Sequence, residues 1–355
     1  MAQHWQSLVD LQKLAAWMDL QGLGSGTLEN VHALTGGTQN VLLRFRRGAR
    51  EFVLRRPPAH PIVDGTKTMR REARVLAALA GTSVPHPRLI AVCAEPSVLG
   101  AAFYLMEPVN GFSPIGGLPP SFADRPQWRT RMGEAIIDAL AELASVDHSA
   151  VGLGDFARIE DYHAAQIARW RNQFESYRQF EGWSEPTDLR NLALVSAWLE
   201  RRTPETFRPG LVHGDYTAGN IMFRHDRPVV AAIVDWELAT LGDPLMDLGW
   251  LLATWPDARG ASTISTLEIH PWQGLPDQDA LTARYIMATG RDRASVTWFT
   301  VLACFKLCVL LEGTHARACA GKAALDLGQE LHAAAVRVLA RASAWITGDC
   351  ENSLL

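Results

Sequence analysis

The sequence feature that most constrains the fold is a change of pattern about one third of the way along the chain. Before residue 107, short apolar runs alternate with turns, and Val41–Phe45 and Phe52–Arg55 predict two paired strands around a turn that contains Gly48. After residue 120, apolar residues recur at the three- and four-residue spacing of amphipathic helices. With 355 residues, the chain is long enough for two cores of ordinary size. The pattern predicts a small β-rich lobe followed by a larger helical lobe.

In the first lobe, a helix is expected over residues 68–80, where apolar side chains recur at helical spacing and Gly81 ends the pattern. Two further strands are expected at Ile90–Cys93 and Ala101–Met106. Residues 107–120 are rich in Pro and Gly and are expected to form a linker. The predicted boundary therefore divides the chain into a lobe of residues 1–108 and a lobe of residues 109–355.

The second lobe has four long stretches with helical periodicity. They are Gln127–Val146, Asp161–Phe180, Asp188–Arg202 and Ala294–Ile346. The exception is Leu211–Asp247, where two short apolar runs flank a polar turn and predict a β-hairpin. The expected fold class is α+β, with a cleft between the lobes in which a ligand can bind.

Composition argues against several classes of protein. The 34 basic and 38 acidic residues give a formal net charge of −4, which offers no positive excess for nucleic acid or an anionic membrane. The apolar stretch Val301–Leu311 is interrupted by Lys306 and is expected to be too short to span a bilayer. The N-terminus lacks the pattern of a secretory signal, and the 5 cysteines form no close pairs, which predicts reduced thiols. We expect a cytoplasmic protein that binds neither nucleic acid nor membrane.

The residues best suited to chemistry lie in and beside the predicted hairpin. The segment Leu211-Val-His-Gly-Asp-Tyr-Thr-Ala-Gly-Asn places Asp215 and Asn220 at the two ends of one short loop, and Asp235 ends the following strand. Phosphoryl transfer requires a carboxylate that orients and deprotonates the acceptor hydroxyl. It also requires Mg²⁺, which prefers oxygen ligands from carboxylates and carbonyl-type groups. A base, an amide ligand and a carboxylate ligand could therefore converge on one point.

The segment His213-Gly-Asp-x-x-x-x-Asn, with Asp235-Trp-Glu, resembles the aminoglycoside phosphotransferase and choline kinase family, distant relatives of the protein kinases. The string from Asp235 to Gly249 is most similar to the kinase-like domains fused to some acyl-CoA dehydrogenases and to their stand-alone bacterial relatives. Further matching segments are Phe52-Val-Leu-Arg, Arg71-Glu-Ala-Arg-Val-Leu-Ala-Ala-Leu, Tyr104-Leu-Met-Glu and Gln166-Ile-Ala-Arg-Trp. The resemblance implies a two-lobed protein-kinase-like fold that transfers the γ-phosphate of ATP, with Mg²⁺, to a hydroxyl of a small molecule. A homodimer is left open.

The same resemblance implies a role for each matching residue. Asp215 would be the catalytic base, and Asn220 and Asp235 would hold Mg²⁺. Arg55 takes the place of the phosphate-contacting residue and Glu72 pairs with it, although Arg departs from the Lys of protein kinases. The remaining implied nucleotide contacts are Gly36, Gly37 and Thr38, in a loop over the phosphates, and Met106 and Glu107, at the hinge that receives the adenine.

Several neighbouring residues have structural explanations. His213 is expected to hydrogen-bond the loop backbone. Asp243 and Asp247 flank Pro244 at an expected helix start, where a capping carboxylate is common, and bracing of the loop is the alternative for Asp247. Cys304 and the nearby Cys308 are expected to be buried packing residues.

Two other functions stay open at this point. A phosphohydrolase with two metal ions would need several histidines near these aspartates, and only His213 and His225 are close in sequence. A non-catalytic nucleotide-binding protein would usually lack the base or a metal ligand, whereas all three candidate residues are present.

One charge pattern bears on whether the acceptor is cationic or anionic. Residues 166–183 carry Arg169, Arg171 and Arg178 against two glutamates. Kinases for cationic acceptors usually line the acceptor site with carboxylates. This basic excess, and the resemblance to the domains fused to acyl-CoA dehydrogenases, favour a hydroxyacyl-CoA or another anionic hydroxy compound. An aminoglycoside or another sugar is the alternative.

Overall fold

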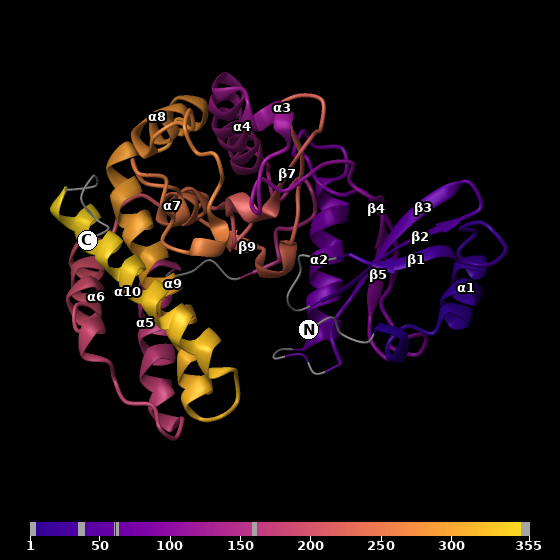
Figure 1. Cartoon of the computed structure of the whole chain (residues 1–355), viewed down its shortest axis with the longest axis horizontal. Coiled ribbons are helices and arrows are strands. Elements are labelled where there is room, and N and C mark those ends of the chain that lie inside the picture. The colour runs from indigo at the N-terminus through magenta and orange to yellow at the C-terminus, as the bar shows by residue number, and fades with distance from the viewer. Residues whose placement is uncertain (1–4, 35–39, 60, 62–63, 158–161, 349–355) are drawn as a thin grey trace.

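The computed structural model describes residues 5–34, 40–59, 61, 64–157 and 162–348. The strands of the small lobe and the long helices of the large lobe lie on opposite sides of the molecule (Figure 1). The predicted α+β class and two-lobed arrangement are confirmed. The predicted boundary at residue 108 lies directly after the last strand of the small sheet and stays a prediction.

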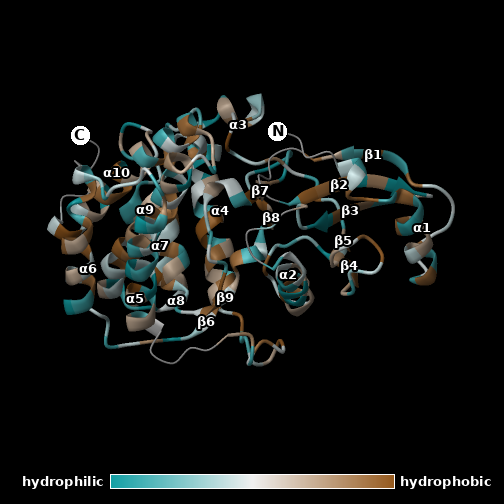
Figure 2. Ribbon diagram, turned by 90° about the horizontal axis from the view of Figure 1, so that it is seen from below, coloured by the Kyte–Doolittle hydropathy of each residue, from teal (hydrophilic) through white to brown (hydrophobic). Residues whose placement is uncertain are grey.

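A five-stranded antiparallel sheet forms the small lobe, in the strand order β1-β2-β3-β5-β4. Its strands are β1 (Glu29–Ala33), β2 (Val41–Arg47), β3 (Arg50–Arg56), β4 (Leu89–Cys93) and β5 (Phe103–Met106). Helix α1 (Leu11–Leu20) shares a hydrophobic core with β2, β3 and β5. Helix α2 (Gly65–Leu79) lies at the junction between this sheet and the large lobe (Figure 2).

Most predicted elements of the small lobe are confirmed, with shifted ends. The β2–β3 hairpin forms, and Gly48 occupies the left-handed conformation in its turn, with φ of 58°. Helix α2 begins earlier than predicted because the Asp64 side chain accepts a hydrogen bond from the Lys67 N–H at 3.0 Å and caps the helix. Helix α1 and strand β1 were not predicted.

Helices make up most of the large lobe. They are α3 (Pro120–Ala123), α4 (Pro126–Ala144), α5 (Tyr162–Glu175), α6 (Leu192–Arg201), α7 (Leu245–Thr254), α8 (Gln278–Thr289), α9 (Val296–Cys319) and α10 (Leu325–Thr347). Helix α9 is central, since it packs against α5, α6, α7 and α10. Every residue of α7 is buried, so this helix is a fixed support for whatever it contacts. The long predicted helices are confirmed, the last of them as α9 and α10 separated by a turn, whereas α8 was not predicted.

Two small antiparallel pairs complete the large lobe. The predicted hairpin is confirmed as β7 (Ile221–Phe223) paired with β8 (Val230–Ile233). A second pair, β6 (Gly210–Val212) with β9 (Thr240–Gly242), was not predicted. The short helix η5 (Trp236–Leu238) lies between β8 and β9 and contacts α2 of the small lobe.

The segment predicted as a linker, residues 107–120, has no helix or strand before Pro120, but its centre is attached to the large lobe by an isolated bridge. The Phe112 N–H donates to the Phe223 carbonyl at 2.9 Å, and the Phe223 N–H donates back to Phe112 at 2.8 Å. The Phe112 ring also packs against the Phe122 ring. This segment is therefore attached to the β7–β8 hairpin, because backbone pairing and aromatic contacts outweigh its Pro- and Gly-rich composition.

The expectation that the apolar stretch around Val301 is too short to cross a membrane is wrong on length. The helical segment Arg293–Cys319 is 27 residues long and apolar enough to do so. However, 72% of its apolar window is buried inside the fold, as in the core helix of a globular protein. Its hydrophobicity is explained by its central position among the helices of the large lobe.

Candidate active site

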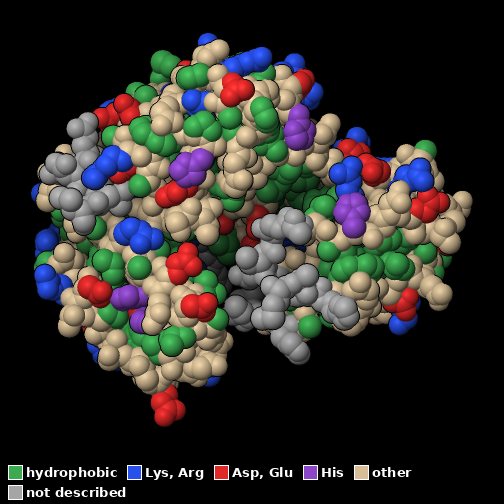
Figure 3. Space-filling view, in the orientation of Figure 1, with side chains coloured by type: hydrophobic (Ala, Val, Ile, Leu, Met, Phe, Trp, Pro, Cys, Tyr) green, Lys and Arg blue, Asp and Glu red, His purple; other side chains and the backbone are tan. Residues whose placement is uncertain are grey.

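The candidate residues lie where the lobes meet, on the loop after β6 and on the segment after β8. Figure 3 shows the molecule hollowed between the two lobes, with acidic side chains inside the hollow. Residues 213–220 join β6 to β7, and we refer to them as the 213–220 loop. This loop belongs to the large lobe, so its geometry is fixed mainly by the helices behind it.

A buried carboxylate from α7 fixes the start of the 213–220 loop. The Asp247 side chain accepts hydrogen bonds from the N–H groups of His213 at 2.7 Å and of Gly214 at 2.9 Å. Burial raises the pKa of Asp247, although His213 and these backbone hydrogen bonds oppose the shift. Asp243 instead accepts at Oδ1 from the N–H of Leu245, the first residue of α7, at 3.0 Å, and pairs with Arg291 at 3.0 Å. Of the two alternatives for Asp247, the structure therefore supports bracing of the loop.

The first two loop residues have clear structural requirements. Gly214 has a φ of +86°, and a Cβ there would lie 2.5 Å from the Leu238 carbonyl oxygen, so only glycine fits. The His213 ring donates from Nε2 to the Val234 carbonyl at 3.0 Å and accepts at Nδ1 from the Asp215 N–H. Burial lowers the pKa of His213, which favours the neutral ring that these two hydrogen bonds require. The predicted role of His213 in bonding the loop backbone is confirmed.

Asp215 is held in one orientation by two donors. Its Oδ1 accepts from the indole N–H of Trp250 at 2.8 Å, and its Oδ2 accepts from Nδ2 of Asn220 at 2.8 Å. Asn220 uses the same nitrogen to bond the Asp215 carbonyl, so its amide oxygen is left for another partner. Burial raises the pKa of Asp215, and the hydrogen bond from Trp250 is the largest effect opposing it. A half-buried carboxylate with a raised pKa suits a general base.

Asp235 joins the two lobes from the end of β8. Its backbone has a φ of 67°, a left-handed conformation that is uncommon outside glycine but tolerated by Asp. Its Oδ1 lies 2.5 Å from a guanidinium nitrogen of Arg55, on β3 of the small lobe. Arg55 also reaches Glu72 of α2, with 3.1 Å between Nε and Oε2. The Arg55 guanidinium therefore joins three predicted site residues from separate elements, because it contacts both Glu72 and Asp235.

The Arg55–Glu72 pair is buried, with side chains 7% and 1% exposed, which excludes an ordinary surface ion pair. Burial raises the pKa of Glu72 to about 7, Arg55 opposes the shift, and the neighbouring carboxylates add to it. Glu237 completes the cluster, because it lies 3.5 Å from Arg55 and accepts from Nδ2 of Asn40 at 2.8 Å. One cation among three carboxylates leaves an excess of negative charge near Asp235.

The remaining predicted nucleotide contacts have different outcomes. Gly36, Gly37 and Thr38 lie outside the described residues. Met106 ends β5, and Glu107 follows it with an N–H that already donates to the Arg88 carbonyl at 2.9 Å. Because this N–H is already bonded, the Glu107 backbone could contact a nucleotide through its carbonyl oxygen. Its side chain lies at the surface, 3.4 Å from Arg50.

Two residues next to Asp215 were not singled out from the sequence. Trp250 follows Asp247 by one helical turn and so lies on the same side of α7. Lys306 was noted only as an interruption in an apolar run, and its Nζ lies 4.4 Å from the centre of the Trp250 ring. A single charged residue within an otherwise apolar helix was the available signal for Lys306.

The three arginines expected to favour an anionic acceptor differ in their surroundings. Arg171 forms an exposed ion pair with Glu200 at 2.6 Å, and Arg178 forms one with Glu185 at 2.9 Å. Arg169 packs over the ring of Trp170 and enters no ion pair within the described part of the chain. Of the three arginines, Arg169 is therefore the one whose charge is not paired within the described residues.

The oxygen groups near Asp235 fit a magnesium ion. The Asp235 carboxylate and the amide oxygen of Asn220 are the hard donors that Mg²⁺ prefers, and the surrounding carboxylates leave a negative charge for it to offset. The Val234 N–H donates to the Asn220 carbonyl at 2.9 Å, which ties the two donor residues together through the backbone. Both donors are therefore held on one rigid unit of the large lobe.

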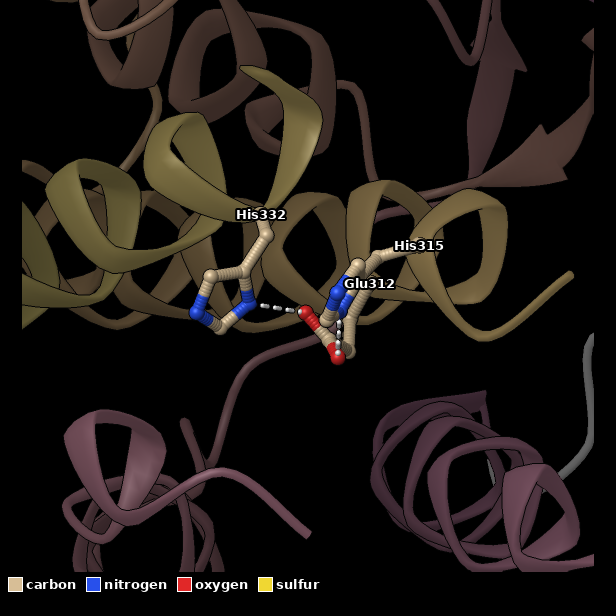
Figure 4. A group of neighbouring side chains, drawn as sticks. All are labelled: Glu312, His315 and His332. Atoms are coloured by element: carbon tan, nitrogen blue, oxygen red, sulfur yellow. Dashed lines mark hydrogen bonds and ion pairs between the residues drawn. The ribbon is translucent and has the colours of Figure 1, made fainter. Parts of the chain in front are cut away.

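A second group of possible ligands lies between α9 and α10 (Figure 4). Glu312 is fully buried, and its carboxylate accepts from His315 at 2.8 Å and from His332 at 2.6 Å. It also accepts from the indole N–H of Trp183 at 2.7 Å. The ligand atoms of the three acid and histidine residues lie within 4.8 Å of one another. Since the Glu312 carboxylate already accepts three hydrogen bonds, we interpret the cluster as a structural hydrogen-bond network between α9 and α10.

The fold and the residues around Asp215 and Asp235 define a kinase-like small-molecule phosphotransferase. Residues 30–271 match the family described as the phosphotransferase enzyme family, and the chain belongs to it. The human acyl-CoA dehydrogenase family member 11 is 28% identical over 326 residues, which cover 88% of this chain and 40% of the relative. The chain thus spans well under half the length of the curated relatives it matches.

Solved structures agree with this assignment. A candidate aminoglycoside phosphotransferase from Ralstonia eutropha is 29% identical, has a TM-score of 0.76, and matches 94% of this chain over 98% of its own. The GDP complex of aminoglycoside 2'-phosphotransferase-IIIa has a TM-score of 0.65 at 14% identity, over 92% of this chain and 99% of its own. The latter likeness establishes the shared kinase-like fold.

Proposed function

We propose that the protein transfers the γ-phosphate of ATP to a hydroxyl group of a small anionic acceptor, such as a hydroxyacyl-CoA. The observation that carries the proposal is the placement of Asp215. Two donors orient this carboxylate, and it lies beside Asp235, which the Arg55–Glu72 pair connects to the small lobe. A base for the hydroxyl and a charged group for the phosphates thus lie on adjoining parts of one site.

In the proposed reaction, Asp215 accepts the proton of the acceptor hydroxyl as its oxygen attacks the γ-phosphorus. The bond between that phosphorus and the oxygen bridging to the β-phosphate breaks, and ADP leaves. Trp250 and Asn220 prevent the carboxylate from rotating during this step. The raised pKa of Asp215 makes it a stronger base than an exposed Asp, because burial disfavours its charged form.

Asp235 and the amide oxygen of Asn220 would hold Mg²⁺, which would neutralise charge on the phosphates. Arg55 would bind phosphate oxygens through its planar head, which presents paired N–H donors. Glu72, on α2, bonds Nε of the same guanidinium group and keeps it in place, while Asp235 contacts the group from the large lobe. The nucleotide named for a structural neighbour, GDP, supports a nucleotide site in this fold.

The anionic class of acceptor is favoured by the charges near Asp215. Lys306, on α9, lies over the ring of Trp250, whose indole N–H holds Asp215, and Arg169, on α5, is close enough to act on the charge of Lys306. The names of the curated relatives, which are acyl-CoA dehydrogenase family members, point to acyl-CoA chemistry as well. An aminoglycoside, which is polycationic, would meet like charge at both residues.

The proposal is tested by incubating the purified protein with Mg·ATP and either hydroxybutyryl-CoA or kanamycin, and measuring ADP and phosphorylated acceptor. We expect phosphorylation of the acyl-CoA compound and none in the Asp215→Asn variant. Efficient phosphorylation of kanamycin alone would refute the acceptor class. Mg·ATP binding without transfer to any acceptor would favour a non-catalytic nucleotide-binding protein, and phosphate release from phosphate esters without ATP would favour a phosphohydrolase.

A further inference from the structure

Lys306 reaches from α9 to the 213–220 loop, next to the proposed base Asp215. Its Nζ donates to the carbonyl oxygen of Gly214, the residue before Asp215, at 3.3 Å. The same nitrogen lies over two indole rings, 4.4 Å from the centre of Trp250 and 5.5 Å from that of Trp170. The Lys306 side chain leaves α9 within a run of buried apolar residues, so it does not belong to the solvated surface of the helix.

The bonding of Lys306 is incomplete. An ammonium group has three N–H donors, and one of them bonds Gly214. Within the described part of the chain, no carboxylate forms an ion pair with Nζ, and the indole rings attract the charge without accepting a full hydrogen bond. Burial lowers the pKa of Lys306 to about 8, so the group is still mainly charged at pH 7. A half-buried cation with unused donors can bind an anionic or strongly polar oxygen.

The location of Lys306 indicates which substrate it meets. The carboxylates that act on its charge are Asp215 and Asp247, and the cation that acts on it is Arg169. The groups proposed for the nucleotide, Arg55 and Asp235, lie on the side of Asp215 that faces the small lobe. Lys306 therefore stands on the acceptor side of the base, between α5 and α7.

We propose that Lys306 binds the acyl oxygen of the acceptor, as a carboxylate or a thioester carbonyl, and thereby holds the acceptor hydroxyl at Asp215. The flat rings of Trp170 and Trp250 restrict the ammonium group to one position, and Arg169 adds positive charge at the outer end. Lys306 is a specificity-determining residue in this view, since an acceptor without an acyl group gains nothing from it. The inference rests on the proposed function, because it assigns a substrate contact within the same site.

The experiment compares acceptors that carry a hydroxyl on similar chains but differ in the acyl group: hydroxybutyryl-CoA, hydroxybutyrate and butanediol, with free coenzyme A as a fourth probe. Calorimetry in the presence of Mg·ADP gives each Kd without turnover, and steady-state assays with Mg·ATP give KM and kcat. The variants are Lys306→Met and Lys306→Arg. Lys322→Met is the matched control, because Lys322 is exposed and lies beside Phe180, away from Asp215.

We expect Lys306→Met to raise the Kd and KM of hydroxybutyryl-CoA and hydroxybutyrate by about 10- to 100-fold, the loss typical of a charge-assisted hydrogen bond. Butanediol and free coenzyme A are expected to change by less than about 3-fold. Lys306→Arg is expected to keep most of the affinity, and Lys322→Met all of it. Thermal unfolding of each variant checks that the fold is intact.

Three results would overturn the inference. Equal losses for butanediol and the acyl compounds would mean that Lys306 supports Asp215 or the fold. A loss for free coenzyme A would mean that Lys306 contacts the phosphates of coenzyme A. Unchanged Kd values for both acyl compounds would exclude any contact. The proposed function fails separately, if the unaltered protein transfers phosphate from ATP to neither acyl compound.

Discussion

Replacing Arg55 with Met is expected to lower the free energy of unfolding by about 3–5 kcal/mol, because the change leaves a buried charge without its partner. Glu72 is only 1% exposed, and Arg55 is its ion-pair partner at 3.1 Å. Asp235 and Glu237 would then face Glu72 without an intervening cation. Since burial already raises the pKa of Glu72 to about 7, removal of Arg55 is expected to raise it further.

The assay is urea unfolding at pH 7, followed by tryptophan fluorescence. Arg50→Met is the matched control, since Arg50 lies on the same strand in an exposed ion pair with Glu107 and should cost at most about 1 kcal/mol. The double variant Arg55→Met/Glu72→Gln is expected to recover about 1–3 kcal/mol through their coupling. A loss in Arg55→Met no larger than in Arg50→Met, or no recovery in the double variant, would refute the reasoning.

The same pair gives a pH dependence of stability. The native state keeps the Glu72 proton up to a pH of about 7, whereas an unfolded chain loses it near the ordinary value of 4.5. The native state therefore binds more protons between these values, and the contribution of Glu72 to stability falls as the pH rises through the interval. Glu72→Gln is expected to remove this part of the slope.

Four further outcomes are expected. Asp215→Asn should lower kcat by about 10²–10⁴-fold and leave Mg·ATP affinity within a few-fold by calorimetry, because the base acts on the acceptor; near-normal turnover would exclude it as the base. Asp235→Ala should abolish Mg²⁺-dependent binding of ATP, and an unchanged Kd would remove Asp235 from the metal site. Asp247→Ala should cost about 2–4 kcal/mol in urea unfolding and most of the activity, because two buried N–H groups lose their acceptor; full activity would show that the loop needs no brace. Burial lowers the pKa of His332, but Glu312 and the nearby Asp188 outweigh it and raise the net value above 6.5. Its contribution to stability should be complete below pH 6.5 and be lost as the pH rises through the native pKa, and His332→Asn should flatten the urea midpoint between pH 6 and 9.

The part of the site that was predictable from sequence is the part whose residues are close in the chain. Asp215 and Asn220 are separated by one short loop, and local spacing alone brings their side chains within 2.8 Å of each other. Their pairing with Asp235 follows from a hairpin that composition also indicates. The family resemblance then supplied Arg55 and Glu72, which no local pattern would have joined.

The rest depends on packing between distant elements. Lys306 comes from a helix that begins at Val296, and its single charge in an apolar run does not indicate which distant side chains it contacts. Trp250 is one of 12 tryptophans, and only the position of α7 behind the loop selects it. Strands β6 and β9 have three residues each, too few to show an alternating pattern. The roles of short strands and of single charged residues depend on their neighbours in the folded structure, and the periodicity of the sequence does not identify those neighbours.

The spacing of two residues on α7 has a consequence for how the specificity of this family member can change. Asp247 holds the backbone of the 213–220 loop and Trp250, one turn later, holds the Asp215 side chain, so a single buried helix sets both. Together with Lys306, these supports all belong to the large lobe. The proposed acceptor contacts therefore lie on the large lobe, whereas the proposed nucleotide contacts are divided, with Arg55 on the small lobe and Asn220 and Asp235 on the large lobe. A small lobe exchanged for that of a relative should alter nucleotide affinity and leave acceptor preference unchanged.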